Sequence, residues 1–204
     1  MVDNKAMFSL SYGLFVLSVH ENGFDNGCII NTVMQITDTP NQIVIAVNKN
    51  NKTHDMIVST GKFNVSTISE KADFSLFERF GFNSGRDTDK FSGFIGVEKA
   101  SNNIFYITEN TNSFISGEVV SQIDCGTHSM FVAKVTETKI LNDDKSATYA
   151  YYFENIKPKP KMSNSSKKKF VCSVCGYVYE GESLPKDFIC PLCKHGAEVF
   201  EELN

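Results

Sequence analysis

Segments with the texture of β-strands dominate the first three quarters of the chain. Runs rich in Val, Ile, Phe and Tyr recur there between short turn signals, a pattern typical of strands. The expected strands cover Tyr12 to His20, Cys28 to Ile36, Gln42 to Asn48, Lys62 to Ile68, Phe91 to Glu98, Phe114 to Ile123, Met130 to Leu141 and Thr148 to Phe153. Between the first two runs, two Asn-Gly steps in residues 21–27 predict a hairpin loop.

Helical periodicity is confined to short stretches. Thr53 to Thr60 follows a pair of asparagines and stops at Gly61, and residues 74–82 carry phenylalanines at helical spacing. Residues 6–10 add at most one turn. Many strands with one or two short helices predict a mainly β fold, with the strands closed into a barrel.

The composition and the hydrophobic pattern of the chain change abruptly after Phe153. Residues 157–169 contain six lysines, two prolines and three serines and have no apolar period, so we expect a linker. A lysine run can also be a docking patch or a nucleic-acid arm, but a run this short is more typical of a solvated tether. The expected domains are residues 1–156, the linker 157–169 and a small domain at 170–204.

Length and charge agree with a medium domain followed by a small one. The chain has 204 residues and a net charge of −4, which gives no general reason to expect binding to nucleic acid or to a membrane. The apolar run at residues 9–19 is interrupted by Ser and Gly and is too short to span a bilayer. Cys28 and Cys125 form no disulfide-like framework, so we expect a reducing, cytoplasmic compartment.

Two Cys-x-x-Cys pairs in the small domain carry the clearest chemistry. Cys172 and Cys175 form the first pair and Cys190 and Cys193 the second, with fourteen residues between them. Four thiolates directed at one point suit zinc or iron. Two disulfides are an alternative, and a thioredoxin-like redox pair would need a βαβ context that about 35 residues without helical pattern cannot supply. A segment this small rarely folds on apolar burial alone, so we expect the metal to hold it together.

The sequence Cys-x-x-Cys-Gly-Tyr-x-Tyr followed by Cys-Pro-x-Cys resembles the two knuckles of a rubredoxin. The resemblance implies that Cys172, Cys175, Cys190 and Cys193 bind one iron. The loop between the pairs is short, closer to the rubredoxin-like domain of rubrerythrins, and Lys194 stands where the family commonly has glycine. The family's core tryptophan is absent, so we expect an interior made by the rings of Tyr177, Tyr179, Phe188 and Phe200. Zinc remains an alternative to iron at this site, since tetrathiolate geometry suits both metals.

No phosphate-binding loop, dinucleotide fingerprint or nucleophile elbow occurs in the large domain. Polar residues do gather in two places, along residues 31–37 and along residues 48–54, which open a predicted helix. Lysines and helix N-terminal amides can bind a phosphate, although Asn-rich segments before helices usually serve only as caps.

Five segments of the large domain resemble successive blocks of the flavin-reductase-like, FMN-binding split barrel. They are residues 11–15, 31–37, 48–54, 80–91 and 126–131, and the likeness covers nearly all of residues 1–153. The family implies a Greek-key barrel that forms a homodimer, with FMN close to the dimer interface. It assigns Asn31, Thr32, Gln35 and Thr37 to the ring and ribityl chain, Asn48, Lys49, Thr53 and His54 to the phosphate, and Ser84, Gly85, Arg86 and Lys90 to the closing of the pocket.

Three further residues are weighed against simple structural roles. The family resemblance places His128 near the flavin face, where it would act in catalysis, although a lone histidine among strands is often structural. Cys28 could contact the flavin ring, but a small buried apolar side chain is the simpler interpretation, and Cys125 receives that interpretation too.

The whole chain resembles the high-molecular-weight rubredoxins, in which a split-barrel flavin domain precedes a rubredoxin domain. The resemblance implies that electrons from NAD(P)H, taken directly or through a separate NADH-dependent reductase, pass through FMN to the iron. The acceptor would be a flavodiiron oxygen or nitric oxide reductase. The alternative is an NAD(P)H-dependent flavin reductase with a structural zinc ribbon. A nucleic-acid-binding ribbon would be basic, whereas residues 170–204 carry 2 basic and 6 acidic groups.

Overall fold

The computed structural model describes residues 6, 9–158, 168–173, 177–190 and 196–203. The chain divides into two compact units, Met1–Glu154 and Asn155–Asn204. Each unit is described by itself.

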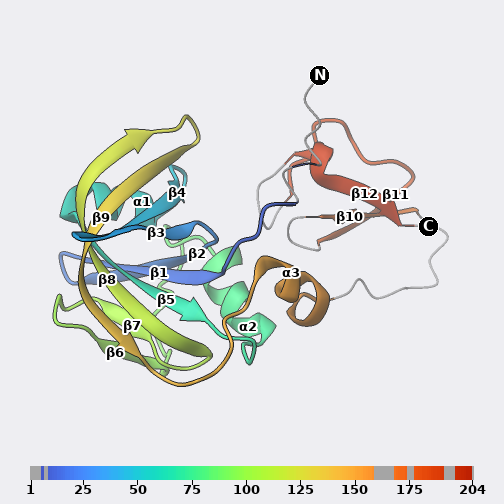
Figure 1. The fold of residues 1–204 in the computed structure, drawn as a ribbon. Coiled ribbons are helices and arrows are strands. Elements are labelled where there is room, and N and C mark those ends of the chain that lie inside the picture. The colour runs from blue at the N-terminus through green and yellow to red at the C-terminus, as the bar shows by residue number, and fades with distance from the viewer. Residues whose placement is uncertain (1–5, 7–8, 159–167, 174–176, 191–195, 204) are drawn as a thin grey trace. The chain divides into compact units, whose positions relative to one another are not determined.

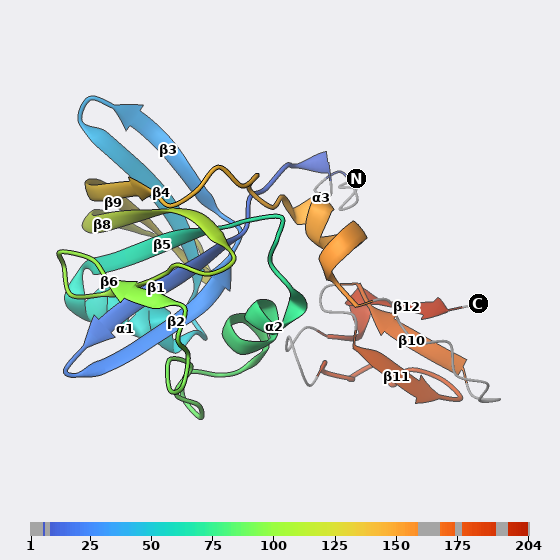
Figure 2. The same ribbon diagram turned by 90° about the horizontal axis from the view of Figure 1, so that it is seen from below.

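Seven antiparallel strands form the main sheet of the first unit. They are β1 (Phe15–Glu21), β2 (Phe24–Ile30), β3 (Val33–Asp38), β4 (Asn41–Asn48), β5 (Lys62–Ile68), β8 (Thr111–Asp124) and β9 (His128–Ile140), and they lie in the order β2-β1-β5-β8-β9-β4-β3. The two edge strands, β2 and β3, are joined only by Asn31 and Thr32. A link of this length spans roughly 11 Å, so the edges must approach each other there and the sheet curls into a barrel (Figure 1 and Figure 2).

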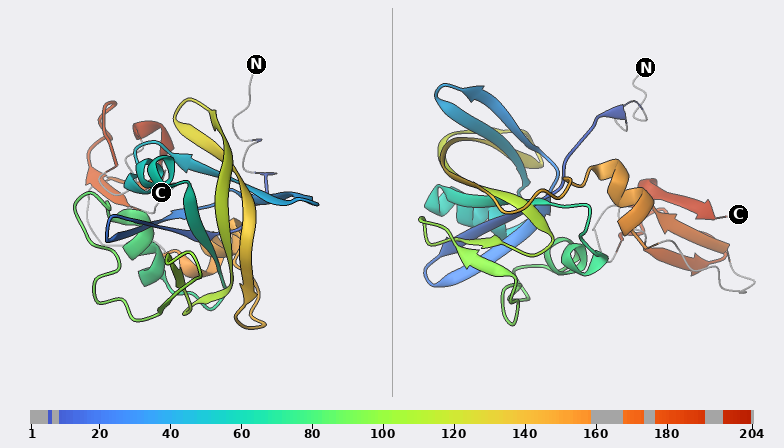
Figure 3. Two further views of the ribbon diagram at one scale, coloured as in Figure 1. Left: turned by 90° about the vertical axis from the view of Figure 1, so that its left-hand side faces the viewer. Right: turned by 60° about the horizontal axis from the view of Figure 1, so that its bottom comes forward.

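The hairpin of β8 and β9 connects the two halves of this curved sheet (Figure 3). The first part of β8 pairs with β5, and the first part of β9 pairs with β4. The register between β8 and β9 shifts after Ser116 and again after Val119. Bulges of this kind bend a strand and increase its twist, which allows two long strands to follow the curve.

The core of the barrel comes from the inward-facing residues of these strands and from α1 (Lys52–Thr60). Ile45, Phe63 and Phe131 are among its fully buried members, and α1 adds Met56 and Ile57. The helix stops at Gly61, whose positive φ of 67° lets its N–H close the last turn on the carbonyl of Ile57. The helix predicted from Thr53 to Thr60 is confirmed.

The segment after β5 shows one prediction that is confirmed and one that is wrong. The helix expected at residues 74–82 is present as α2 (Phe74–Phe77) and the π-helical turn η2 (Glu78–Phe82). In contrast, the strand expected from Phe91 to Glu98 is mostly loop, since β6 (Val97–Lys99) begins only at its end and pairs with β7 (Phe105–Ile107). The rings of Phe91 and Phe94 pack on Phe80, at centroid distances of 5.3 and 5.5 Å, so their burial needs no strand.

The strand predicted from Thr148 to Phe153 is also wrong, because these residues form the helical turns α3 (Tyr149–Tyr151) and η3 (Tyr152–Ile156). Thr148 caps the turn by accepting a hydrogen bond from the N–H of Tyr151 at 3.1 Å. Helical spacing brings the rings of Tyr149 and Phe153 together, with centroids 4.9 Å apart. Aromatic residues favour strands when isolated, but here their mutual packing selects the helix.

The second unit is a three-stranded antiparallel sheet in the order β11-β10-β12. Its elements are β10 (Lys168–Cys172), β11 (Val178–Gly181), the 3₁₀ turn η4 (Ala197–Val199) and β12 (Phe200–Leu203). Lys168 and Lys169, the last two residues of the predicted linker 157–169, therefore lie in a strand. Their ammonium groups pair with Glu202 at 2.8 Å and Glu180 at 3.7 Å across the sheet. The domain boundaries at residues 156 and 170 stay a prediction.

Candidate functional site

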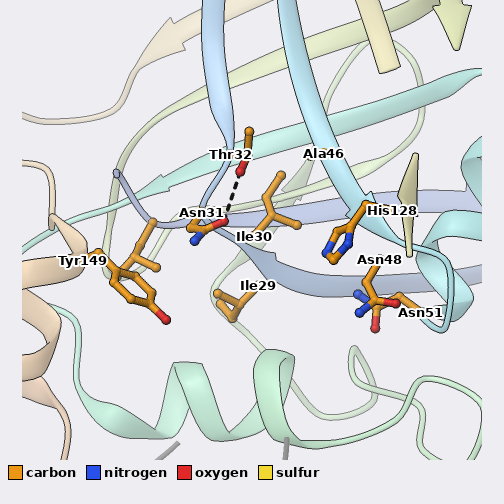
Figure 4. A pocket seen from close by; sticks show the side chains of 10 residues that line it. Ile29, Ile30, Asn31, Thr32, Ala46, Asn48, Asn51, His128 and Tyr149 are labelled. Carbon is orange, nitrogen blue, oxygen red and sulfur yellow. Dashed lines mark hydrogen bonds between the residues drawn. The ribbon is translucent and has the colours of Figure 1, made fainter. Parts of the chain in front are cut away.

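A cavity of about 210 Å³ lies where β2 passes into β3, at the point where the two edges of the sheet meet. Its lining consists of Leu14, Ile29, Ile30, Asn31, Thr32, Ala46, Asn48, Asn51, His128 and Tyr149. In Figure 4 the polar side chains of Asn48, Asn51 and His128 gather at one end and Tyr149 lies at the other. Four residues named from the sequence thus meet here, namely Asn31, Thr32, Asn48 and His128.

Strand pairing explains why residues far apart in sequence meet at this cavity. Asn48 ends β4 and His128 begins β9, and the two are direct partners across the β4–β9 ladder. Thr32 is tied to the same ladder, since its carbonyl accepts a hydrogen bond from the N–H of Ala46 at 3.3 Å. The Thr32 hydroxyl donates to Oδ1 of Asn31 at 3.1 Å, which leaves the amide NH₂ of Asn31 as a donor at the cavity.

His128 is partly buried, and burial lowers the pKa of its imidazole below the usual value. Its Nδ1 atom lies 2.9 Å from the hydroxyl of Thr127, which orients the ring. At neutral pH the ring is therefore uncharged, and Nε2 remains for one hydrogen bond to a ligand.

The segment predicted to bind phosphate is organised by its own hydrogen bonds. Asn51 is the N-cap residue of α1 and makes no side-chain cap bond, whereas the Lys49 ammonium pairs with Asp124 at 2.7 Å. Thr53 is buried and accepts a hydrogen bond from Asn26 at 3.0 Å. His54 is nearly buried, with Nε2 2.9 Å from the Ser129 hydroxyl. Of this group, Asn48 lines the cavity, and the sequence missed its neighbour Asn51.

Ser129, His54 and Asp55 lie in the order of a hydrolase triad, with His54 Nδ1 3.3 Å from the Asp55 carboxylate. Ser129 is completely buried within β9 and also accepts a hydrogen bond from the amide of Gln122 at 3.2 Å. Its hydroxyl therefore cannot reach a substrate, and the arrangement stabilises the packing of α1 on the sheet.

Ser84, Gly85, Arg86 and Lys90 lie on the loop after η2 and do not line the cavity. The backbone of Gly85 packs so closely on the Asn26 side chain that a Cβ atom would collide with it. Arg86 pairs with Asp55 at 2.6 Å, and this neighbour lowers the pKa of the Asp55 carboxyl. These contacts hold the loop against α1 and β2.

Lys90 is almost completely buried, and its ammonium donates to the carbonyl oxygens of Gly27 at 2.8 Å and Phe80 at 3.0 Å. Burial lowers the pKa of Lys90, and it raises that of the thiol of Cys28. Cys28 is buried beside Lys90, Thr53 and Asn51, as a small apolar core residue would be. The same role predicted for Cys125 is wrong, because Cys125 is exposed in the β8–β9 turn.

Gln35 and Thr37 lie farther along β3, away from the cavity. Gln35 donates to Oδ1 of Asn41 at 3.1 Å and lines a second, more apolar cavity of about 340 Å³. Most of its walls are formed by apolar side chains, namely Phe15, Val33, Ile43, Ile115 and Val135. Met34 and Ile36, which do not line this cavity, are exposed on the edge strand β3.

The second unit contains two of the four predicted metal ligands among its described residues. Cys172 at the end of β10 and Cys190 are both completely buried. Cys175 and Cys193 lie outside the described residues, so the four-cysteine site stays a prediction. The Cys172 N–H donates to the carbonyl of Tyr177 at 2.8 Å.

The four aromatic residues predicted for the interior of this unit do pack against one another, although each of them is only partly buried. The ring of Phe188 packs against Tyr179 with centroids 4.8 Å apart and against Phe200 at 5.3 Å. Tyr177 contacts Phe188 and Phe200 at 6.3 and 6.5 Å. These four rings occupy the place of a larger hydrophobic core.

Comparison with known families agrees with this division. Residues 7–159 match the flavin reductase like domain, and residues 170–201 match the rubrerythrin, rubredoxin-like domain. Within the described part of the chain, no helix is long and apolar enough to cross a membrane.

Two characterised relatives are similar over most of the chain. A high molecular weight rubredoxin of Moorella thermoacetica is 32% identical over 99% of this chain and 100% of its own length. A ferric-chelate reductase (NAD(P)H) of Archaeoglobus fulgidus is 33% identical over 74% of this chain and 89% of its own length. Among solved structures, the NADH:FAD oxidoreductase SgcE6 of Streptomyces globisporus has a TM-score of 0.65 at 15% identity, covering 72% of this chain and 90% of that one.

Proposed function

Because this chain belongs to the flavin reductase like family and carries a rubredoxin-like domain behind it, we propose that it is a two-cofactor electron-transfer protein. Electrons from NAD(P)H, taken directly or through a separate reductase, would pass through FMN to an iron held by four cysteines. From there they would reach an acceptor such as a flavodiiron oxygen or nitric oxide reductase. The observation that carries the proposal is the pairing of both domains in one chain, which is homologous over its whole length to a high molecular weight rubredoxin.

The side chains of the first cavity suit a flavin. The leucine and isoleucines of the wall offer an apolar surface to a flat ring, while Asn31, Asn48 and Asn51 offer amide groups at its edge. His128 would donate or accept one hydrogen bond through Nε2 without adding charge, because its lowered pKa keeps it neutral. Bound FMN would supply the chemistry that converts a two-electron hydride into single electrons.

The size of the cavity supports a homodimer. Its volume of about 210 Å³ lies below the ~300–1,000 Å³ typical of a complete ligand pocket, so one chain supplies only part of the enclosure. Met34 and Ile36 leave apolar surface on the edge strand β3. A second copy of the chain that covers this edge would satisfy its free backbone groups and complete the flavin site.

The chemistry of the second unit suits a thiolate-bound metal. Cys172 and Cys190 are buried in the unit that also contains the aromatic cluster, and the matched domain is rubredoxin-like. Such a site would bind iron through Cys172, Cys175, Cys190 and Cys193, and the hydrophobic rings would limit the access of water. The unit's exposed carboxylates, among them Glu182, Asp187 and Glu201, would favour a partner with a basic surface.

A second candidate function is an NAD(P)H-dependent flavin reductase whose ribbon binds structural zinc. The similarity to a ferric-chelate reductase supports it, because that relative is matched over 74% of this chain, a share that the first unit alone can supply. Zinc and iron both accept four thiolates in a tetrahedron, so the donor set is compatible with either metal.

An anaerobic visible spectrum of protein from its native source, recorded before and after addition of NADH and with metal analysis, tests the proposal. We expect flavin absorption and ferric-thiolate bands, both bleached by NADH. Bands that NADH leaves unbleached would retain the carrier role but require a separate reductase. Zinc in place of iron, with flavin present, would overturn the electron-transfer proposal and favour the flavin reductase.

A further inference from the structure

Tyr149 lines the cavity at the end opposite His128, yet it belongs to the helical segment that follows the barrel strands (Figure 4). Among the described lining residues, it carries the one benzene-type ring. The other walls are aliphatic side chains, amides, a hydroxyl and the imidazole. Its position gives the cavity an aromatic wall that the strand predicted for residues 148–153 did not anticipate.

The backbone of Tyr149 is fixed to the barrel. Its N–H donates to the carbonyl of Tyr12 at 2.9 Å, and Thr148 forms a β-bridge with Gly13. Gly13 directly precedes Leu14, another lining residue. The backbone of Tyr149 is therefore anchored to the short segment that also supplies the lining residue Leu14.

The ring of Tyr149 is supported on the side of its own helix. Phe153 meets it edge-on with centroids 4.9 Å apart, and Tyr12 meets it edge-on at 6.3 Å. Tyr149 is only partly buried, so part of its surface remains for a ligand. A ring packed from behind is held in place at little further entropic cost when a flat ligand binds.

From this placement we propose that Tyr149 is a flavin-recognition residue, whose ring contacts the isoalloxazine. The inference rests on the proposed flavin site and adds to it a residue of the segment by which the chain leaves the first unit. An aromatic wall recognises the flat ring and not the phosphate, so FMN and riboflavin should depend on Tyr149 alike. An electron-rich phenol in contact with a flavin also quenches flavin fluorescence, which phenylalanine and leucine do not.

The test uses the full chain and the variants Tyr149→Phe, Tyr149→Leu and Tyr151→Leu. Tyr151 is the matched control, because it lies in the same helical turn but does not line the cavity. Binding of FMN and riboflavin is measured by calorimetry, and the fluorescence lifetime of the bound flavin is recorded separately.

We expect Tyr149→Leu to lower the affinity for FMN and for riboflavin by about tenfold, since an aromatic contact contributes up to ~1.5 kcal/mol beyond its buried area. Tyr149→Phe should keep the affinity within about threefold but lengthen the fluorescence lifetime. Tyr151→Leu should change neither quantity. Unaltered affinity in Tyr149→Leu, or an equal loss in Tyr151→Leu, would overturn the inference alone, whereas failure of the wild-type chain to bind flavin would overturn the proposed function with it.

Discussion

The hydroxyl of Thr127 lies 2.9 Å from Nδ1 of His128, so the residue directly before the histidine orients its ring at the cavity. The N–H of Lys49 donates to the carbonyl of Thr127 at 3.0 Å, and this bond joins the β8–β9 turn to the segment before α1. The imidazole is thereby positioned by the fold and not by a ligand.

Replacement of Thr127 by valine removes the orienting hydroxyl at nearly constant volume. We expect the rate of flavin reduction by NAD(P)H to fall by about threefold to tenfold, the value of one hydrogen bond of ~1 kcal/mol. Thr127→Ser keeps the hydroxyl and should retain the wild-type rate. Stopped-flow measurement of flavin bleaching decides between them, and a valine variant as fast as wild type would show that Thr127 does not act through His128.

The pH dependence of His128 follows from its burial. Because the pKa is lowered in the folded chain, His128 contributes nothing to the pH dependence of stability above its unfolded value of about 6.5. As the pH falls below that value the unfolded chain binds the proton more readily, and stability is lost. We expect the imidazole resonance to titrate below pH ~6.5 in NMR spectra of the folded protein. A midpoint at or above this value would contradict the burial argument.

Lys90 should contribute to stability in a pH-dependent way. Among the described residues no carboxylate pairs with its ammonium, which relies on two carbonyl oxygens. Lys90→Met should lower the free energy of unfolding by about 2 kcal/mol at pH 7 through the loss of these bonds.

Since burial lowers the pKa of Lys90, the stability of the wild type relative to Lys90→Met should rise as the pH increases toward 10.5, where the unfolded chain also loses its proton. Urea unfolding at a series of pH values measures this difference. Lys62→Met, at an exposed position of β5, is the control and should show almost no effect. A difference between wild type and Lys90→Met that is independent of pH would indicate that Lys90 titrates like a solvated lysine.

The second unit should depend on its metal for folding. Cys172→Ser removes a proposed ligand, and with it we expect loss of the metal and of the dispersed NMR signals of the Tyr177, Tyr179, Phe188 and Phe200 rings. The first unit has its own core and should keep its spectrum. Cys125→Ser, at an exposed thiol of the β8–β9 turn, is the matched control and should leave metal content unchanged. Intact ring signals in a metal-free Cys172→Ser variant would show that the aromatic cluster folds without the metal.

Local pattern was sufficient for several elements. β5 has the predicted bounds Lys62 to Ile68. α1 ends before Gly61, whose positive φ allows its N–H to bond to the carbonyl of Ile57 in the last turn. The aromatic interior of the second unit followed from four rings around two cysteine pairs. The bounds of β5 and α1 depend on neighbours a few residues away, and the ring cluster follows from aromatic residues within one short domain, so these signals are present in the sequence itself.

The errors arose where packing between distant residues overrides local preference. The sequence pattern predicted a strand that includes Phe91 and Phe94, but both residues lie in a loop and their rings pack on Phe80. The pattern also predicted a strand at Tyr149, whereas the contact between the rings of Tyr149 and Phe153 requires the spacing of a helix. Thr53 and His54, which the family resemblance assigns to a phosphate site, are buried and hydrogen-bonded to Asn26 and Ser129, contacts that no local pattern predicts.

By itself the sequence determined the two-domain division in outline, the mainly β class, the cysteine pairs and the family of the large domain, because each rests on composition or on a short motif. Only the tertiary structure decided that Asn31, Asn48, His128 and Tyr149 share one cavity. Strand order β2-β1-β5-β8-β9-β4-β3 is a property of long-range pairing, and the closure of its edges at Asn31 and Thr32 creates the site. No local pattern encodes that closure, since it depends on the curvature of the whole sheet.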